Sequence, residues 1–323
     1  GIQEAVRCFT PPSDVASSVL LTASVEIDGH LLSSGAGTVF TYYHDVNLIA
    51  VQPDAGPTMG QTEVVVLAAN LGSGPGPFQC RFGSGDSVAA TIELHRQALR
   101  CVTSAGLART STVEISLNGQ QYHGAYASKF VFYEPPRILS ISPTSGTMLG
   151  HTDVTIVGIG FQPSAKLCRW DTLVTSVAQS NASHIVCASP VLEQGLAAVE
   201  ISLNGQQYTS DAVMFSAYLD PHVHELSVQG HQGEVDSSLA DKVTLPVAGF
   251  VLVRAWGSGF MGGTDYRCRI NEAVPIAATY DAEHDCILCW SDLWTESPNT
   301  VEVTLNGREY TTDGLALTIN QFF

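Results

Sequence analysis

The ten residues VEISLNGQQY occupy positions 113–122 and return letter for letter at 199–208. A diverged copy, VEVTLNGREY, fills 301–310, and the fainter VEIDG fills 25–29. Apolar and polar residues alternate along the start of each copy, which is typical of a strand with one buried face. The Asn-Gly or Asp-Gly pair that follows tolerates positive φ at both positions and predicts a tight type I′ turn. The sequence therefore predicts the same β-hairpin four times.

The alternation places Val113, Ile115 and Leu117 on the buried face of the first intact copy, and Glu114 and Ser116 on its outer face. Core packing explains identity at buried positions, but exposed positions tolerate substitution and have no folding reason to match. Recent duplication would explain the identity, and so would an edge that meets a repeated partner. The residues of this interaction edge are Glu114, Gln120, Gln121, Glu200, Gln206 and Gln207.

The spacing of the copies indicates the domain organisation. Counted at the residue before the turn glycine, the copies stand 90, 86 and 102 residues apart. This period is too long for a solenoid or a propeller blade and fits one sandwich-sized domain. We therefore expect the C-terminal half of a truncated domain at 1–45, whole domains at 46–136, 137–221 and 222–323, and a chain that is a fragment of a longer protein.

The composition of the chain argues against some classes of function. Only 14% of the 323 residues are charged, the net charge is −17, and the 14 Lys and Arg residues form no cluster. Each neutralised phosphate needs a basic side chain, so this composition argues against binding to nucleic acid. No apolar run is long enough to span a membrane, and residues 1–20 lack the basic and apolar regions of a signal peptide.

The whole domains share their first and last segments. Residues 47–67 and 137–161 each contain a strand, a turn rich in Pro and Gly, and a second strand. Aromatic strands at 130–133 and 215–218 close the first two domains, and short linkers with Pro follow. Short linkers of this kind limit swing, so we expect consecutive domains to be held end to end as a rod.

The motif Ile-x-x-Ile-x-Pro-x-x-Gly, followed by Gly-x-Thr-x-Val-x-Ile-x-Gly-x-x-Phe, spans 138–161. With a Cys pair and the stretch Val-x-Ile-x-Leu-Asn-Gly, it resembles the IPT/TIG family of immunoglobulin-like domains, found in plexins, fibrocystin-like proteins and protist and algal surface proteins. The resemblance covers the second whole domain fully and the first nearly so. It implies an all-β fold of tandem antiparallel β-sandwiches with about seven strands each, and a role in spacing or recognition with no active site and no cofactor.

The third domain departs from this pattern over residues 222–260. Its opening lacks the Pro-x-x-Gly turn and carries about a dozen extra residues around 234–247. The stretch AWGSGF at 255–260 restores the register. We expect the same fold in this domain with a different opening.

Each whole domain carries two cysteines at matching positions, 19 or 21 residues apart. One pair per domain indicates disulfides in an oxidising compartment, and the alternative is buried reduced thiols in a cytosolic protein. Closing a loop of about 20 residues contributes about 3 kcal/mol in the chain-entropy account. The expected pairs are Cys80–Cys101, Cys168–Cys187 and Cys268–Cys289.

Two cysteines lie outside these pairs. Cys8 occupies the place of a second pair member, so we expect its partner upstream of residue 1. Cys286 and Cys289 have the Cys-x-x-Cys spacing of redox and zinc sites, but no second such motif supplies four ligands. We expect Cys286 to be a spare thiol or an intermolecular link.

Candidate metal sites are weak. His222 and His224 would lie on one side of a strand, near Glu225 and His231, although incidental surface histidines are the simpler explanation. The second candidate is a group of acidic residues near the domain junctions, but it lacks the dense carboxylate spacing that a calcium site requires. These are Asp45, Asp54, Glu134 and Asp220. We find no phosphate loop, nucleophile elbow or paired-carboxylate motif in the sequence.

One modification motif fits the cysteine pattern. Asn181-Ala182-Ser183 is an acceptor sequence for N-glycosylation and follows a polar stretch that should be an exposed loop. Together with the cysteine pairs, it favours a secreted or surface protein.

These observations predict a non-enzymatic extracellular or cell-surface protein, a rod of tandem domains that acts as a stalk, adhesin or filament subunit. Its partners would be proteins, including further copies of itself, and it would need no membrane contact within this fragment. The alternative is an accessory region of a large secreted carbohydrate-active enzyme. A role as a transcription factor, also known for this family, conflicts with the acidic charge.

Overall fold

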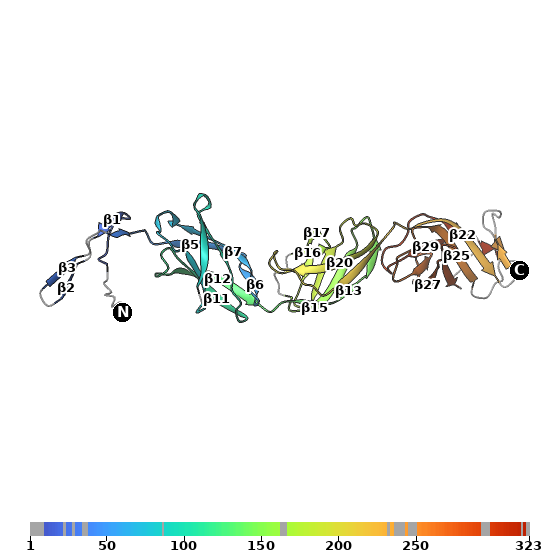
Figure 1. Ribbon diagram of the computed structural model, residues 1–323. Helices are drawn as coiled ribbons and strands as arrows, with labels where there is room; N and C mark the ends of the chain where they lie inside the picture. Colours follow the sequence, from blue (N-terminus) through green and yellow to red (C-terminus); the bar gives the residue numbers. More distant parts are fainter. Residues whose placement is uncertain are drawn as a thin grey trace. The chain divides into compact units, whose positions relative to one another are not determined.

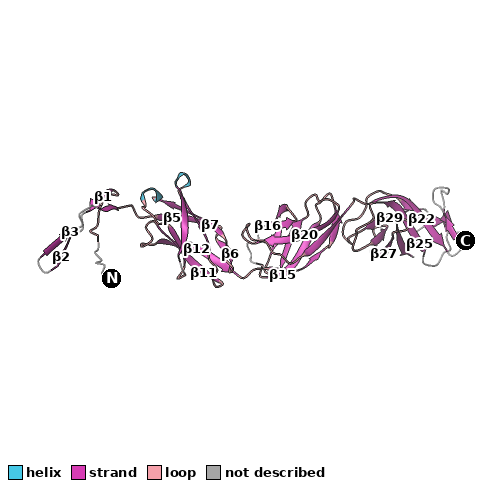
Figure 2. Ribbon diagram, viewed as in Figure 1, coloured by secondary structure: helices cyan, strands magenta, loops and turns pink. Residues whose placement is uncertain are grey.

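The structure is a computed structural model. It describes residues 10–21, 24–27, 30–33, 38–85, 87–161, 167–230, 233–235, 243–244, 251–291, 298–317 and 319–320. These residues form β-strands and two single-turn 3-10 helices, η1 (Leu71–Ser73) and η2 (Leu94–Arg96) (Figure 2). The chain divides into two compact units, Gly1–Pro135 and Pro136–Phe323. Within the described residues, no helix has the length and apolar character to cross a membrane.

The first unit begins with two short antiparallel pairs. β1 (Ser18–Leu21) pairs with β4 (Thr38–Thr41), and β2 (Ser24–Ile27) pairs with β3 (His30–Ser33). Cys8 and the Asp-Gly turn at 28–29 lie outside the described residues. The assignment of residues 1–45 to half a domain stays a prediction.

The rest of the first unit is one sandwich (Figure 1). Its strands pair in the order β5-β7-β10-β9-β8-β11-β12-β6. β9 pairs with β8 through its first half and with β10 through its second, so it passes from one layer to the other. The strands are β5 (Asn47–Gln52), β6 (Ala55–Pro57), β7 (Glu63–Ala69), β8 (Gln79–Phe82), β9 (Ser87–Glu93), β10 (Ala98–Val102), β11 (Arg109–Ser116) and β12 (His123–Tyr133).

The second unit contains two sandwiches. The first of these has two separate sheets, ordered β13-β15-β19-β18 and β14-β21-β20-β16-β17. Its strands are β13 (Arg137–Ser142), β14 (Ser145–Thr147), β15 (Asp153–Ile159), β16 (Leu167–Trp170), β17 (Leu173–Ser176), β18 (Gln179–Ser180), β19 (His184–Ala188), β20 (Gly195–Ser202) and β21 (Val213–Tyr218).

The last sandwich pairs its strands in the order β23-β22-β25-β28-β27-β26-β29-β30, with β24 and β31 as a separate pair. In place of the short turn between β5 and β6, a long connection separates β22 from β24, and this accounts for the departure at 222–260. The strands are β22 (His222–Gly230), β23 (Gly233–Val235), β24 (Val243–Thr244), β25 (Val251–Ser258), β26 (Arg267–Ile270), β27 (Ile276–Asp281), β28 (Cys286–Ser291), β29 (Asn299–Thr304), β30 (Ala316–Leu317) and β31 (Ile319–Asn320).

The repeated stretch supplies the core as the alternation predicts. Val113, Ile115 and Leu117 are fully buried, and so are their counterparts in the other two sandwiches. The disulfides of the structure join Cys80 with Cys101, Cys168 with Cys187, and Cys268 with Cys289. Each pair connects the strand beside the repeated stretch to a strand of the opposite layer. Cys286 is buried and lies outside these three bonds.

The prediction of tandem immunoglobulin-like sandwiches is confirmed, with one correction to the strand directions. Three short pairs are parallel: β6 with β12, β14 with β21, and β24 with β31. In the first two sandwiches the first strand belongs to one layer, and the next strand, β6 or β14, lies beside the last strand in the other layer. That strand runs in the same direction as the last strand, so the pairing is parallel. In the last sandwich β24 pairs with β31 apart from the main sheet.

Candidate interaction surface at the asparagine-glycine loops

Each intact copy of the repeat ends in a loop, here called the NG loop, at 116–122, 202–208 and 304–310. The asparagine side chain organises it: Asn118 Oδ1 accepts hydrogen bonds from the backbone N–H groups of Gln120, at 2.9 Å, and Gln121, at 3.0 Å. Asn204 and Asn306 accept the equivalent bonds. The loop glycines have φ near +75°, which favours glycine at this position.

The predicted type I′ turn is wrong. Only the glycine of each Asn-Gly pair has positive φ, whereas a type I′ turn needs it at both residues. Because the asparagine side chain bonds the backbone two and three residues ahead, it forms an Asx turn within a wider loop. The loop of the first sandwich closes where Ile115 pairs with His123.

The outward position predicted for Ser116 is also wrong. Ser116, Ser202 and Thr304 are fully buried. Their hydroxyl oxygens lie beneath the loop and contact the asparagine, as in Asn118 N to Ser116 Oγ at 3.4 Å and Asn306 N to Thr304 Oγ1 at 3.3 Å. The strand alternation stops where the loop begins, so it no longer predicts the side-chain direction there.

The glutamate of each repeat pairs with an arginine on the neighbouring strand. Arg81 lies opposite Glu114, and its Nε donates to Glu114 Oε2 at 2.8 Å. The guanidinium carbon of Arg81 also lies 3.9 Å from the ring centre of Tyr122. The same cluster forms from Arg169, Glu200 and Tyr208, and from Arg269, Glu302 and Tyr310.

This cluster gives the repeated glutamate and tyrosine a folding role. Cross-strand ion pairs and cation–π contacts of this exposure each contribute about 0.5–1 kcal/mol. The expectation that the outward glutamates have no folding reason to match is wrong, because Glu114 and Glu200 each pair with an arginine. The signal was present in the sequence, because an arginine follows the first cysteine of every pair, at 81, 169 and 269.

The loop glutamines of the interaction edge have unequal environments. Gln120, Gln121 and Gln206 are exposed, and Gln207 is half-buried. The side-chain amide of Asn118 donates to Gln121 Oε1, and that of Asn204 donates to Gln207 Oε1 at 2.6 Å. In the last sandwich Glu309 takes this place and accepts from Asn306 at 2.7 Å.

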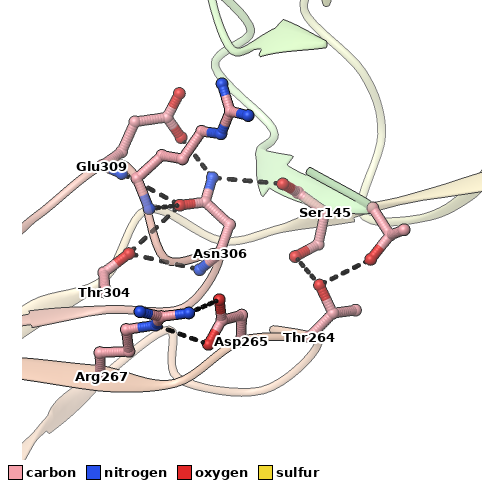
Figure 3. A network of polar contacts seen from close by, with 9 residues as sticks. Ser145, Thr264, Asp265, Arg267, Thr304, Asn306 and Glu309 are labelled. Atoms are coloured by element: carbon pink, nitrogen blue, oxygen red, sulfur yellow. Dashed lines mark hydrogen bonds and ion pairs between the residues drawn. The ribbon is translucent and has the colours of Figure 1, made fainter. Parts of the chain in front are cut away.

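The NG loop of the last sandwich contacts the sandwich before it (Figure 3). Asn306 Nδ2 donates to the backbone carbonyl of Ser145 in β14 at 3.2 Å. Thr152 Oγ1 donates to Glu309 Oε2 at 3.1 Å. Thr264 Oγ1 lies 2.8 Å from the hydroxyls of both Thr144 and Ser145. These bonds join the end of one sandwich to the start of the next.

The junction combines burial with negative charge. Asn306 is 3% exposed and Tyr218, which ends β21, is 2% exposed. Burial raises the pKa of Tyr218 well above its ordinary value, and the nearby carboxylates of Glu309 and Asp220 raise it further. Tyr218 therefore stays a neutral phenol at ordinary pH.

An aspartate fixes the start of each sandwich in the second unit. Asp211 accepts from the backbone N–H of Ile138 at 2.7 Å, and Asp313 accepts from that of Val223 at 2.7 Å. His222 Nδ1 lies 3.1 Å from Asp313 Oδ1. His222 and His224 are both exposed, and a β-bulge lies between Val223 and Glu225.

The other candidate ligands contact protein groups. His224 Nε2 lies 3.3 Å from Ser258 Oγ, and His231 falls outside the described residues. The acidic residues near the junctions are dispersed among separate contacts, as in Glu134 with Thr58 and Asp220 with Thr147. Within the described part of the chain, no three His, Cys, Asp or Glu residues are arranged to hold a metal ion.

Comparison with known proteins gives one family match, one distant relative and several solved structures of low similarity. Residues 136–217 match the model of the IPT/TIG domain. Fibrocystin-L of Homo sapiens is 24% identical over 244 residues, which cover 72% of this chain and 6% of the relative, so the chain spans a small part of its length. The plexin A4 extracellular region is 17% identical with a TM-score of 0.43, covering 93% of this chain and 24% of that one. Invasin, a bacterial integrin-binding protein, is 10% identical with a TM-score of 0.28, covering 94% and 65%.

Proposed function

We propose that this chain, whose residues 136–217 match the IPT/TIG domain as their motifs predicted, is a structural and interaction segment of an extracellular or cell-surface protein. It acts by holding consecutive sandwiches in fixed order and presenting their loops and strand faces to protein partners. A stalk, an adhesin or a filament subunit would need such a segment. The proposal assigns it no catalytic step.

The contact between the NG loop of the last sandwich and β14 is the observation that carries this proposal. A junction that served only as a flexible tether would need no bonds across it. Here Asn306 and Glu309 bond to Ser145 and Thr152, and Asn306 is buried. Hydrogen bonds weaken steeply away from their preferred geometry, so several together limit the relative rotation of the two sandwiches.

The disulfides support the extracellular location. Disulfides persist in oxidising compartments and are rare in the cytosol. Each of the three connects the two layers of its sandwich, where it stabilises the fold against unfolding under tension.

Only part of the predicted interaction edge is proposed to meet a partner. Glu114 and Glu200 are engaged by arginines, so they support the loop indirectly. The exposed Gln120 and Gln121, with Gln206 and Gln207 in the next copy, are the residues proposed to meet a partner. The loop of the last sandwich supports this proposal, because Asn306 and Glu309 bond to the sandwich before it.

Single-molecule pulling of the whole chain tests the role in spacing. Each sandwich should unfold in a separate event whose length excludes the residues closed by its disulfide. Replacing Cys168 and Cys187 together by alanine should lengthen one event and leave the others unchanged. Unfolding of all sandwiches in a single low-force event would contradict the proposal.

A further inference from the structure

In each sandwich one segment passes from one layer to the other along one side. In the first sandwich β9 pairs with both β8 and β10, and in the last one β27 pairs with both β26 and β28. One strand thus closes that side by linking the two layers. In the second sandwich β17 pairs with β16 and β18 pairs with β19, and between them the Ala178 N–H donates to the carbonyl of Val186 at 2.8 Å, so the same segment links the layers there. β17 lies at the end of its sheet.

The outer edge of β17 exposes apolar residues. Leu173 and Val174 in β17 are 44% and 48% exposed. An edge strand offers backbone N–H and C=O groups to another chain, and proteins usually protect such edges with charges, bulges or a covering group. β17, Leu173-Val174-Thr175-Ser176, contains no charged residue and no proline.

Asn181 lies immediately after β18 on this side, in the turn that leads into β19. Its own N–H donates to the carbonyl of His184 at 2.8 Å. Asn181 Oδ1 accepts from the N–H groups of Ser183 and His184, both at 2.9 Å, and the Ser183 hydroxyl lies 3.4 Å from it. The Asn181 side chain is thus held in place through hydrogen bonds to its oxygen. Asn181, Ala182 and Ser183 are all exposed.

We propose that Asn181 carries an N-linked oligosaccharide and that this glycan shields the exposed edge of β17 from pairing with another chain. The donor is a lipid-pyrophosphate-linked oligosaccharide. A bond forms between Asn181 Nδ2 and C1 of the first sugar, the bond from C1 to the pyrophosphate oxygen breaks, and the amide gives up one proton. The inference rests on the proposed extracellular location, since the donor is met in the secretory pathway.

Two matched variants of Ser183 test the inference in the whole chain, secreted from a eukaryotic cell line. Ser183→Thr keeps the acceptor sequence, and Ser183→Ala removes it while leaving Asn181 Oδ1 its backbone donors. Peptide mass spectrometry should find the glycan on wild type and Ser183→Thr and none on Ser183→Ala. Sedimentation should then show Ser183→Ala self-associating at concentrations where the other two are monomeric. Adding Val174→Lys, which charges the exposed edge, should restore the monomer.

A secreted, disulfide-bonded chain with an unmodified Asn181 overturns the inference and leaves the proposed function standing. An Ser183→Ala chain as monomeric as wild type overturns the shielding role. Retention of the chain inside the cell with reduced cysteines would instead overturn the extracellular proposal.

Discussion

Asn306 donates its side-chain amide to the backbone carbonyl of Ser145, 161 positions earlier in the sequence (Figure 3). The oxygen of the same amide accepts the backbone N–H groups of Arg308 and Glu309. One buried side chain therefore shapes its own loop and connects that loop to the preceding sandwich. The NG loop of the last sandwich is a docking element as well as a turn.

Replacing Asn306 by alanine should lower the free energy of unfolding of the last sandwich by about 1–3 kcal/mol, because buried donors lose their acceptor. It should also speed hydrogen exchange of backbone amides at 144–147, across the junction. Asn118→Ala is the matched control, since it removes the same loop bonds in the first sandwich. If exchange at 144–147 is equal in both variants, the bond to Ser145 does not stabilise the junction.

Replacing Arg169 by methionine should lower the free energy of unfolding, measured in urea, by about 1–2 kcal/mol, because both the ion pair with Glu200 and the contact with Tyr208 are lost. A double-mutant cycle with Glu200→Gln separates the ion pair from the ring contact. The coupling energy should fall as salt is added, since both groups are partly exposed. A coupling energy of zero at low salt would mean that the ion pair does not explain why a glutamate recurs at this position of each repeat.

The repeated stretch predicted the strands of the fold, because the alternation of apolar and polar residues depends only on neighbours in the sequence. Val113 and Ile115 are buried as their period of two requires. Ser116 was misplaced because the asparagine two residues later ends the alternation. The partner of Glu114 comes from a strand 33 positions away, and its pairing register depends on the whole sheet. The contact at the junction could not be predicted from local sequence patterns, since Ser145 and Asn306 belong to different sandwiches.

The three disulfides should leave no free thiol at their six cysteines when the unreduced, unfolded chain is alkylated and analysed by mass spectrometry. Replacing Cys168 and Cys187 together by alanine should lower the free energy of unfolding of that sandwich by about 3 kcal/mol, as expected for closing a loop of about 20 residues. Alkylation of these six positions without reductant would place the protein in a reducing compartment.

Tyr218 should make the second unit sensitive to high pH. Its pKa is raised in the folded chain, by burial first and then by Glu309 and Asp220. Its stabilising effect is therefore complete below about pH 10, where an unfolded tyrosine is still protonated, and is lost as the pH rises further. Tyr218→Phe should unfold at a higher pH than wild type, followed by circular dichroism. Equal alkaline midpoints would show that Tyr218 does not limit stability there.

The distribution of distances between the two sandwiches of the second unit tests the central claim most directly. Spin labels on unnatural amino acids at the exposed positions 172 and 283, one in each sandwich, would report it by pulsed electron resonance. A fixed junction predicts one narrow distribution in wild type and in Asn118→Ala, and a broad one when Asn306 and Glu309 are both replaced by alanine. A broad distribution in the wild-type chain would contradict the claim that the NG loop holds the sandwiches together.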